Sequence, residues 1–130
     1  MVRVFKTRGF TRFMRKEGVT DDALCDAVAR AERGLIDANL GSGVIKQRVP
    51  RPGQGRSGGF RTLIAFKAAE RSVFLFGFAK NDQDNIDADE LKVLRRAAAE
   101  VLNWNEKQVA AMLASGAWIE VDDGREEVQK

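Results

Sequence analysis

The segment FRTLIAFKAAERSVFLFGFAK, residues 60–80, decides the fold. Two stretches rich in large apolar residues flank the short segment Ala68–Arg71, which predicts strands over Phe60–Lys67 and Ser72–Lys80. The second stretch is the most apolar of the chain, so we expect it to be a central strand. The short connection favours an antiparallel meander over crossover connections.

The elements on either side of this pair complete an α+β pattern. A third strand is predicted over Val44–Val49, and a short first strand over Val2–Lys6. Helices are predicted between them and after residue 86, where Thr20, Asp87 and Asn105 have the character of N-caps. The predicted order is β-α-α-β-β-β-α-α, and Trp118–Val121 is either a small strand or a docking segment.

Length and composition favour one domain. The chain has 130 residues, of which 44% are hydrophobic, enough for one compact core. We expect the domain to span residues 1–121 and residues 122–130 to form a flexible polar tail. No stretch approaches the ~18 apolar residues that a membrane helix needs, and the N-terminus lacks the apolar region of a secretory signal. One cysteine allows no internal disulfide, which suits the cytoplasm.

The charges are unevenly distributed along the chain. Residues 1–16 and 38–69 together hold 12 of the 22 lysines and arginines and none of the 19 acidic residues. The net charge is only +3, so the acids are concentrated elsewhere. This separation predicts one basic face, and arginine on such a face suits phosphate because the guanidinium group matches phosphate oxygens.

The glycine-rich stretch RPGQGRSGGFR, residues 51–61, has the spacing of a dinucleotide-binding fingerprint at Gly53, Gly55 and Gly58. Such a fingerprint must open a helix, whose N-terminus meets the pyrophosphate. Here a strand follows, and no Gly-Lys-Ser/Thr of a P-loop is present. Both nucleotide interpretations are therefore rejected, and the glycines are expected to set the shape of a loop that carries arginines.

The residue types exclude several kinds of enzyme. The chain has no histidine and no tyrosine, so Ser-His-Asp and Cys-His arrangements are impossible, and zinc is disfavoured. The acidic run from Asp82 to Glu90 lacks the glycine that an EF-hand loop starting at Asp82 needs at position 87. We expect no metal and no cofactor.

A cluster of basic residues remains as the candidate site. In Val44–Val49, Lys46 and Arg48 point to one face of the strand, and Ile45 and Val49 to the other. A hairpin connection brings Arg61 near the pair. The full set is Lys46, Arg48, Arg51, Arg56, Arg61 and Lys80. Such residues can promote attack of an RNA 2′-OH on its own phosphate: arginines stabilise the charged transition state, and a lysine crowded by cations is a candidate general base. A solvated basic surface without a partner is the alternative.

Five features resemble the RelE/HigB family of type II toxins: the leading strand and helix pair, VIKQRV, PGQGRSGGFRTLIAF, VFLFGFAKND and DADELKVL. The resemblance spans about residues 2–102. It implies a small RelE-like fold, in which a curved, mainly antiparallel sheet of about four strands packs against N-terminal helices, with C-terminal helices. It also implies a cytoplasmic mRNA interferase that cleaves mRNA on the ribosome and is neutralised by an antitoxin, often of the helix-turn-helix type.

The resemblance also assigns site residues. The implied catalytic residues are Arg61, Lys80, Arg56, Lys46 and Arg48, and Arg51 and Phe60 are RNA-binding candidates. Phe60 stands where the family often has a hydroxylated aromatic, so it either stacks on a base or packs into the sheet. Since some members use a tyrosine or histidine near the scissile phosphate and this chain has neither, the general acid and base are open.

Two other functions fit the same sequence. A ParE-like inhibitor of DNA gyrase shares the fold and needs no catalytic cluster, although the concentrated basic residues argue against it. A non-catalytic RNA-binding module or inactivated toxin is consistent with the missing histidine and tyrosine. Three observations separate these functions. Cleavage of translated mRNA indicates the endoribonuclease, and inhibition of gyrase without cleavage indicates the ParE-like inhibitor. Salt-sensitive RNA binding without cleavage indicates the non-catalytic module.

Overall fold

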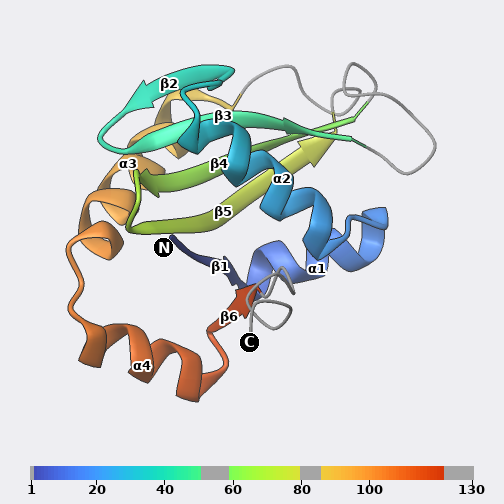
Figure 1. Ribbon diagram of the computed structural model, residues 1–130. Helices are drawn as coiled ribbons and strands as arrows, with labels where there is room; N and C mark the ends of the chain where they lie inside the picture. Colours follow the sequence, from blue (N-terminus) through green and yellow to red (C-terminus); the bar gives the residue numbers. More distant parts are fainter. Residues whose placement is uncertain (1, 51–58, 80–85, 122–130) are drawn as a thin grey trace.

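The computed structural model describes residues 2–50, 59–79 and 86–121. Its described elements form a six-stranded sheet with four helices (Figure 1). In chain order they are β1 (Arg3–Thr7), α1 (Arg8–Glu17), α2 (Asp21–Glu32), β2 (Ala38–Gly41), β3 (Val44–Val49), β4 (Phe60–Lys67), β5 (Arg71–Ala79), α3 (Ala88–Leu102), α4 (Glu106–Ser115) and β6 (Trp118–Val121).

The sheet has the strand order β2-β3-β4-β5-β1-β6, and β5 lies inside it, as predicted. Every pairing is antiparallel except that of β1 with β5. The α+β class is confirmed, but about four strands were expected and the described sheet has six. The prediction missed β2, and Trp118–Val121 proves to be a strand that pairs with β1.

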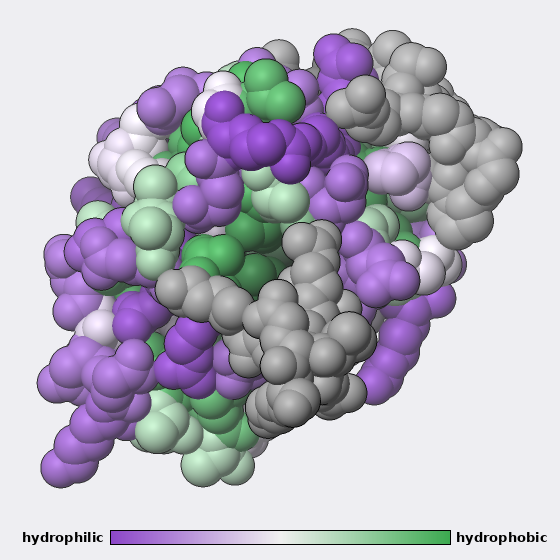
Figure 2. Space-filling view, in the orientation of Figure 1, coloured by the Kyte–Doolittle hydropathy of each residue, from purple (hydrophilic) through white to green (hydrophobic). Residues whose placement is uncertain are grey.

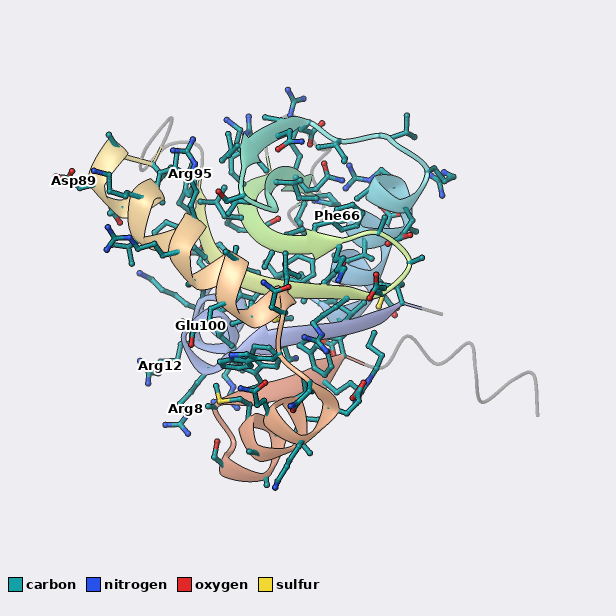
Figure 3. The ribbon with its side chains drawn as sticks, turned by 90° about the vertical axis from the view of Figure 1, so that its left-hand side faces the viewer. Arg8, Arg12, Phe66, Asp89, Arg95 and Glu100 are labelled. Atoms are coloured by element: carbon teal, nitrogen blue, oxygen red, sulfur yellow. The ribbon has the colours of Figure 1, made fainter. Side chains whose placement is uncertain are left out.

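Helices cover both faces of the sheet. On the face that carries α1 and α2, hereafter the α2 face, Phe10, Leu24 and Val28 pack against Ile64 and Phe74. On the opposite face, hereafter the α3 face, a second core is formed by residues of the sheet and of α3 and α4: Phe5, Val44, Leu63, Ala65, Val73, Ala98, Val101, Val109 and Trp118. Figure 3 shows α3 on one side of the sheet and α2 on the other.

Figure 2 looks onto the α2 face of the molecule. Much of the visible surface is hydrophilic, and apolar side chains gather at its centre, over β5 between α2 and β1. Phe66 of β4 and Val2 are half-buried against the core of this face.

Local signals set the ends of the helices. Thr20, Asp87 and Asn105 cap α2, α3 and α4 by accepting a backbone N–H, as the sequence predicts. Gly18 ends α1 in the left-handed region, with φ of 74°. Residues next to the helix termini therefore determine where these helices begin or end.

A glycine in β5 allows α1 to lie close to the sheet. A Cβ on Gly77 would come within 2.6 Å of the ring of Phe13, and Phe10 is also close. Phe13 makes an edge contact with the Phe60 ring, with centroids 5.3 Å apart. This packing fixes α1 beside the strand ends that carry the candidate site.

Candidate functional site

Three basic residues of the candidate set meet on the α3 face. Arg48 of β3 is directly opposite Arg61 of β4, and Lys46 is opposite Leu63. Since side chains two residues apart share a face, Lys46, Arg48 and Arg61 lie on the side of the sheet that Leu63 faces. We call these three residues the cationic cluster. Ile45 and Val49 are buried in the core of the opposite face, as the sequence predicts.

The cluster residues differ in exposure. Arg48 is exposed, whereas Lys46 and Arg61 are half-buried. Nη1 of Arg61 is buried and has no hydrogen-bond partner among the residues that the structure describes. A buried donor without a partner is unusual in a folded protein and calls for an explanation, such as a catalytic role or a bound water or ion.

Two phenylalanines of β5 extend the cluster across the sheet. Phe78 is opposite Arg61 and Phe76 is opposite Leu63, and their ring centroids are 6.0 Å apart. Phe78 is buried and Phe76 is half-buried. We assigned both only to a central strand from the sequence. Strand alternation would have placed them on the face of Arg61 once the register was known.

The outer edge of β3 is held by side chains where its pairing with β2 ends. The last β2 partner of β3 is Ala38, opposite Lys46. Beyond it, the backbone N–H of Arg48 donates to Oδ2 of Asp37 at 2.7 Å, and Nη2 of Arg30 donates to the carbonyl oxygen of Arg48 at 2.6 Å. Asp26 accepts from Nε of the same Arg30 at 3.2 Å. These bonds satisfy the backbone that presents Arg48 to the α3 face.

Gln47 holds the same strand from the α2 face. Its side chain is fully buried, and its Nε2 donates to the carbonyl oxygens of Ala27 and Leu35 at 3.0 and 3.2 Å. Its Oε1 accepts the backbone N–H of Asp37 at 2.8 Å. Gln47 was not predicted from the sequence. Its only signal was a polar residue among apolar ones on the core-facing side of a predicted strand.

The other candidate residues divide into two groups. Arg51, Arg56 and Lys80 lie outside the described residues. Phe60 is fully buried on the α2 face, against Phe13, while its neighbour Arg61 faces the other way. The structure therefore favours packing into the sheet, the second of the two roles expected for Phe60, and its side chain points away from Arg61 because consecutive residues of a strand face opposite sides.

Gly59 sets how the described chain enters β4. A side chain there would collide with the backbone of Val49 and Pro50. The absence of a Cβ lets the strands close together next to the Arg48–Arg61 pair. This agrees with the expected role of the glycines in shaping the loop, at the one loop glycine that the structure describes.

The described part of the chain has basic side chains on paired strands but no set of residues placed to bind a metal ion. Within residues 2–50, 59–79 and 86–121, no group of three or more histidine, cysteine, aspartate or glutamate residues is placed to hold a metal ion. Cations on paired strands are suited to bind phosphate and to stabilise charge that develops on it. In the same ranges, no helix is long and apolar enough to cross a membrane.

Comparison with known families identifies a match over most of the chain. The family model described as the RelE toxin of the RelE / RelB toxin-antitoxin system matches residues 2–121. The match covers both strands of the cationic cluster and all the described helices. No curated protein matches the chain significantly.

Proposed function

This chain belongs to the RelE toxin family, and from this premise we propose that it is an endoribonuclease that cleaves mRNA on the ribosome. The family makes it a toxin of a toxin–antitoxin system, with an antitoxin as its partner. We further propose that the antitoxin is a helix-turn-helix protein encoded next to the toxin, so that the pair is of type II. An unrelated neighbouring gene would contradict that last proposal.

The observation that carries this proposal is the buried Nη1 of Arg61 without a described partner, beside Arg48 on the next strand. A phosphate of bound RNA would bring a negative charge to the two guanidinium groups, and a shift of the half-buried Arg61 side chain toward it would give Nη1 an acceptor. The same geometry binds the pentacovalent phosphate more tightly than the ground state, because the former carries more charge.

In the proposed reaction the RNA supplies both the nucleophile and the leaving group. The 2′-oxygen attacks the adjacent phosphorus and forms a 2′-O–P bond, while the bond from phosphorus to the 5′-oxygen of the next nucleotide breaks. The products are a 2′,3′-cyclic phosphate and a 5′-hydroxyl, and the proton lost by the 2′-OH is balanced by the proton that the 5′-oxygen gains. Arg61 and Arg48 neutralise the phosphate, and the ribosome holds the RNA in line.

Proton transfer is assigned to the lysines because the chain has neither histidine nor tyrosine. We propose Lys46 as the residue that accepts the 2′-OH proton, since it lies on the same face as Arg48 and Arg61. Lys80, Arg56 and Arg51, which are outside the described residues, complete the proposed set as catalytic and RNA-binding groups.

The test is expression of the toxin without its antitoxin, followed by mapping of mRNA 5′ ends. We expect growth arrest and cleavage within translated codons, both lost with Arg61→Ala. Arg33→Ala, which removes an exposed arginine at the end of α2, is the matched control and retains both activities. Full toxicity of Arg61→Ala, or gyrase inhibition by the purified toxin without mRNA cleavage, would contradict the proposal.

A further inference from the structure

Helix α1 has a row of basic residues that the proposed cleavage reaction does not use. Arg8, Arg12, Arg15 and Lys16 are all exposed, and their i, i+4, i+7, i+8 spacing places them on one side of the helix. The opposite side carries Phe10 and Met14, which are buried in the core of the α2 face. We call Arg12, Arg15 and Lys16 the α1 stripe.

Arg8 has a structural role, but the α1 stripe has none that the structure shows. The guanidinium group of Arg8 donates to the carbonyl oxygens of Ser115 and Gly116 at the end of α4, both at 3.4 Å. The side chains of the stripe make no hydrogen bond or ion pair with the residues that the structure describes. Like charges at these spacings repel, so the stripe destabilises the isolated helix.

The other described helices mix their charges. Helix α2 has Asp21, Asp22, Asp26 and Glu32 beside Arg30, and α3 has Asp89, Glu90 and Glu100 beside its basic residues. The one acid of α1, Glu17, lies outside the stripe and is half-buried. Helix α3 also has three exposed basic residues on one side, Lys92, Arg95 and Arg96, but Asp89 and Glu100 lie three and four residues from that group, whereas no acid flanks the α1 stripe in this way.

The position of α1 relates the stripe to the proposed cleavage site. Because β1 runs parallel to β5, α1 begins at the end of the sheet where β5 ends, and Arg61 lies at this same end. Phe13 of α1 contacts Phe60, the neighbour of Arg61. In Figure 3, Arg8 and Arg12 project to the side of the molecule on which α3 lies, the side that the cationic cluster faces.

We propose that the α1 stripe docks on the phosphate backbone of folded ribosomal RNA, outside the strand that is cleaved. Proteins that hold single-stranded RNA combine basic residues with exposed aromatic rings, whereas the aromatic residues of α1, Phe10 and Phe13, are buried and half-buried. Bare cations recognise the backbone regardless of sequence. This inference rests on the proposed function, because it takes the ribosome as the place of action.

The test compares two triple variants that lose the same charge. Arg12→Gln, Arg15→Gln and Lys16→Gln are combined in the first, and Arg33→Gln, Lys67→Gln and Lys107→Gln, all exposed and on other elements, in the second. Affinity for purified ribosomes is measured at several salt concentrations, together with the single-turnover rate of mRNA cleavage at saturating ribosomes. Circular dichroism establishes that each variant is folded.

We expect the stripe variant to bind ribosomes at least about tenfold more weakly at physiological salt. The slope of the logarithm of the binding constant against the logarithm of the salt concentration should fall in magnitude by about two to three, because each lost phosphate contact removes about 0.7–0.9. The control variant retains its affinity within about twofold and its slope. The single-turnover rate is unchanged in both. Arg12→Lys with Arg15→Lys keeps the affinity, because lysine also binds phosphate.

Three results would overturn the inference: equal ribosome binding by the two triple variants, a lower single-turnover rate with ribosome affinity intact, or a loss of antitoxin affinity alone. If the triple stripe variant does not fold, Arg15→Gln alone is used, with an expected slope change of about one. Failure of the proposed function is separate, because an inactive wild-type protein would still show whether ribosome binding depends on the stripe.

Discussion

The two ends of the α3 face use the same strands for opposite purposes. At one end, Leu63 and Ala65 of β4 are buried beneath Ala98 and Val101 of α3. At the other end, Arg61 of the same strand lies opposite Arg48, with one guanidinium nitrogen buried without a described partner. Only two positions along β4 separate Leu63 from Arg61.

The difference shows how one sheet face serves both stability and binding. Apolar side chains under α3 lose water contact on folding and so stabilise the domain. The cationic cluster instead brings like charges together and leaves a polar atom unsatisfied, which opposes folding. Burial under α3 therefore raises the free energy of unfolding and offsets the destabilisation by the cationic cluster. Removing a buried apolar side chain is expected to lower the stability of the domain, whereas replacing a cluster arginine by an apolar residue is expected to raise it.

Leu63→Ala has the largest expected effect. Leu63 is fully buried in the α3-face core, and its truncation should lower the free energy of unfolding by about 2–5 kcal/mol. Urea denaturation measures this loss. Arg48→Ala, at an exposed position two residues nearer the site end, should change it by less than about 0.5 kcal/mol, and equal losses would contradict the contrast between the ends.

Gln47→Ala comes next, because it removes a buried amide beneath the cluster. The carbonyl oxygens of Ala27 and Leu35 and the N–H of Asp37 lose their partner, which should lower the free energy of unfolding by about 2–3 kcal/mol. Since Gln47 lies between Lys46 and Arg48, mRNA cleavage should fall as well. Unchanged stability in urea would show that water replaces these bonds.

Arg61→Leu is expected to raise stability while it abolishes cleavage. The substitution extends the apolar side of β4 toward Phe78 and removes the unsatisfied guanidinium, so unfolding should require about 0.5–1.5 kcal/mol more. Thermal unfolding and the cleavage assay are measured on the same sample. A variant that is both inactive and less stable would mean that Arg61 supports the fold.

The smallest expected effect is the pH dependence of stability that comes from Asp87, the N-cap of α3. This helix covers the apolar end of the α3 face. The backbone N–H of Glu90 donates to Oδ1 of Asp87 and holds the pKa of Asp87 below its ordinary value of 3.8, while the neighbouring Asp87 raises the pKa of the Glu90 carboxyl. Because the folded pKa is depressed, the stabilisation is present above pH 3.8 and is lost as the pH falls through the lowered pKa. Asp87→Asn removes the ionisable carboxyl group. The difference in the free energy of unfolding between wild type and variant should therefore become smaller as the pH falls below 3.8. A gap that is constant with pH in denaturation series would contradict it.

The sequence predicted the features that depend on near neighbours. The caps at Thr20, Asp87 and Asn105 were readable because cap and helix are adjacent, and alternation placed Lys46 and Arg48 on one face. Gln47 and β2 were not predicted, because the partners that bury or pair them come from distant segments. Phe60 was left between two roles, because its burial depends on Phe13 of α1, which comes from a distant segment.

The pairing of β1 has a consequence for synthesis. This strand lies between β5 and β6, and its Arg3 bonds Glu120, 117 residues further along the chain. One edge of β1 therefore stays open until residue 121 has been made, and an open strand edge invites pairing with other chains. Such distant pairing also forms late in folding. The newly made chain thus passes through a period when its first strand is vulnerable, before its last strand protects it.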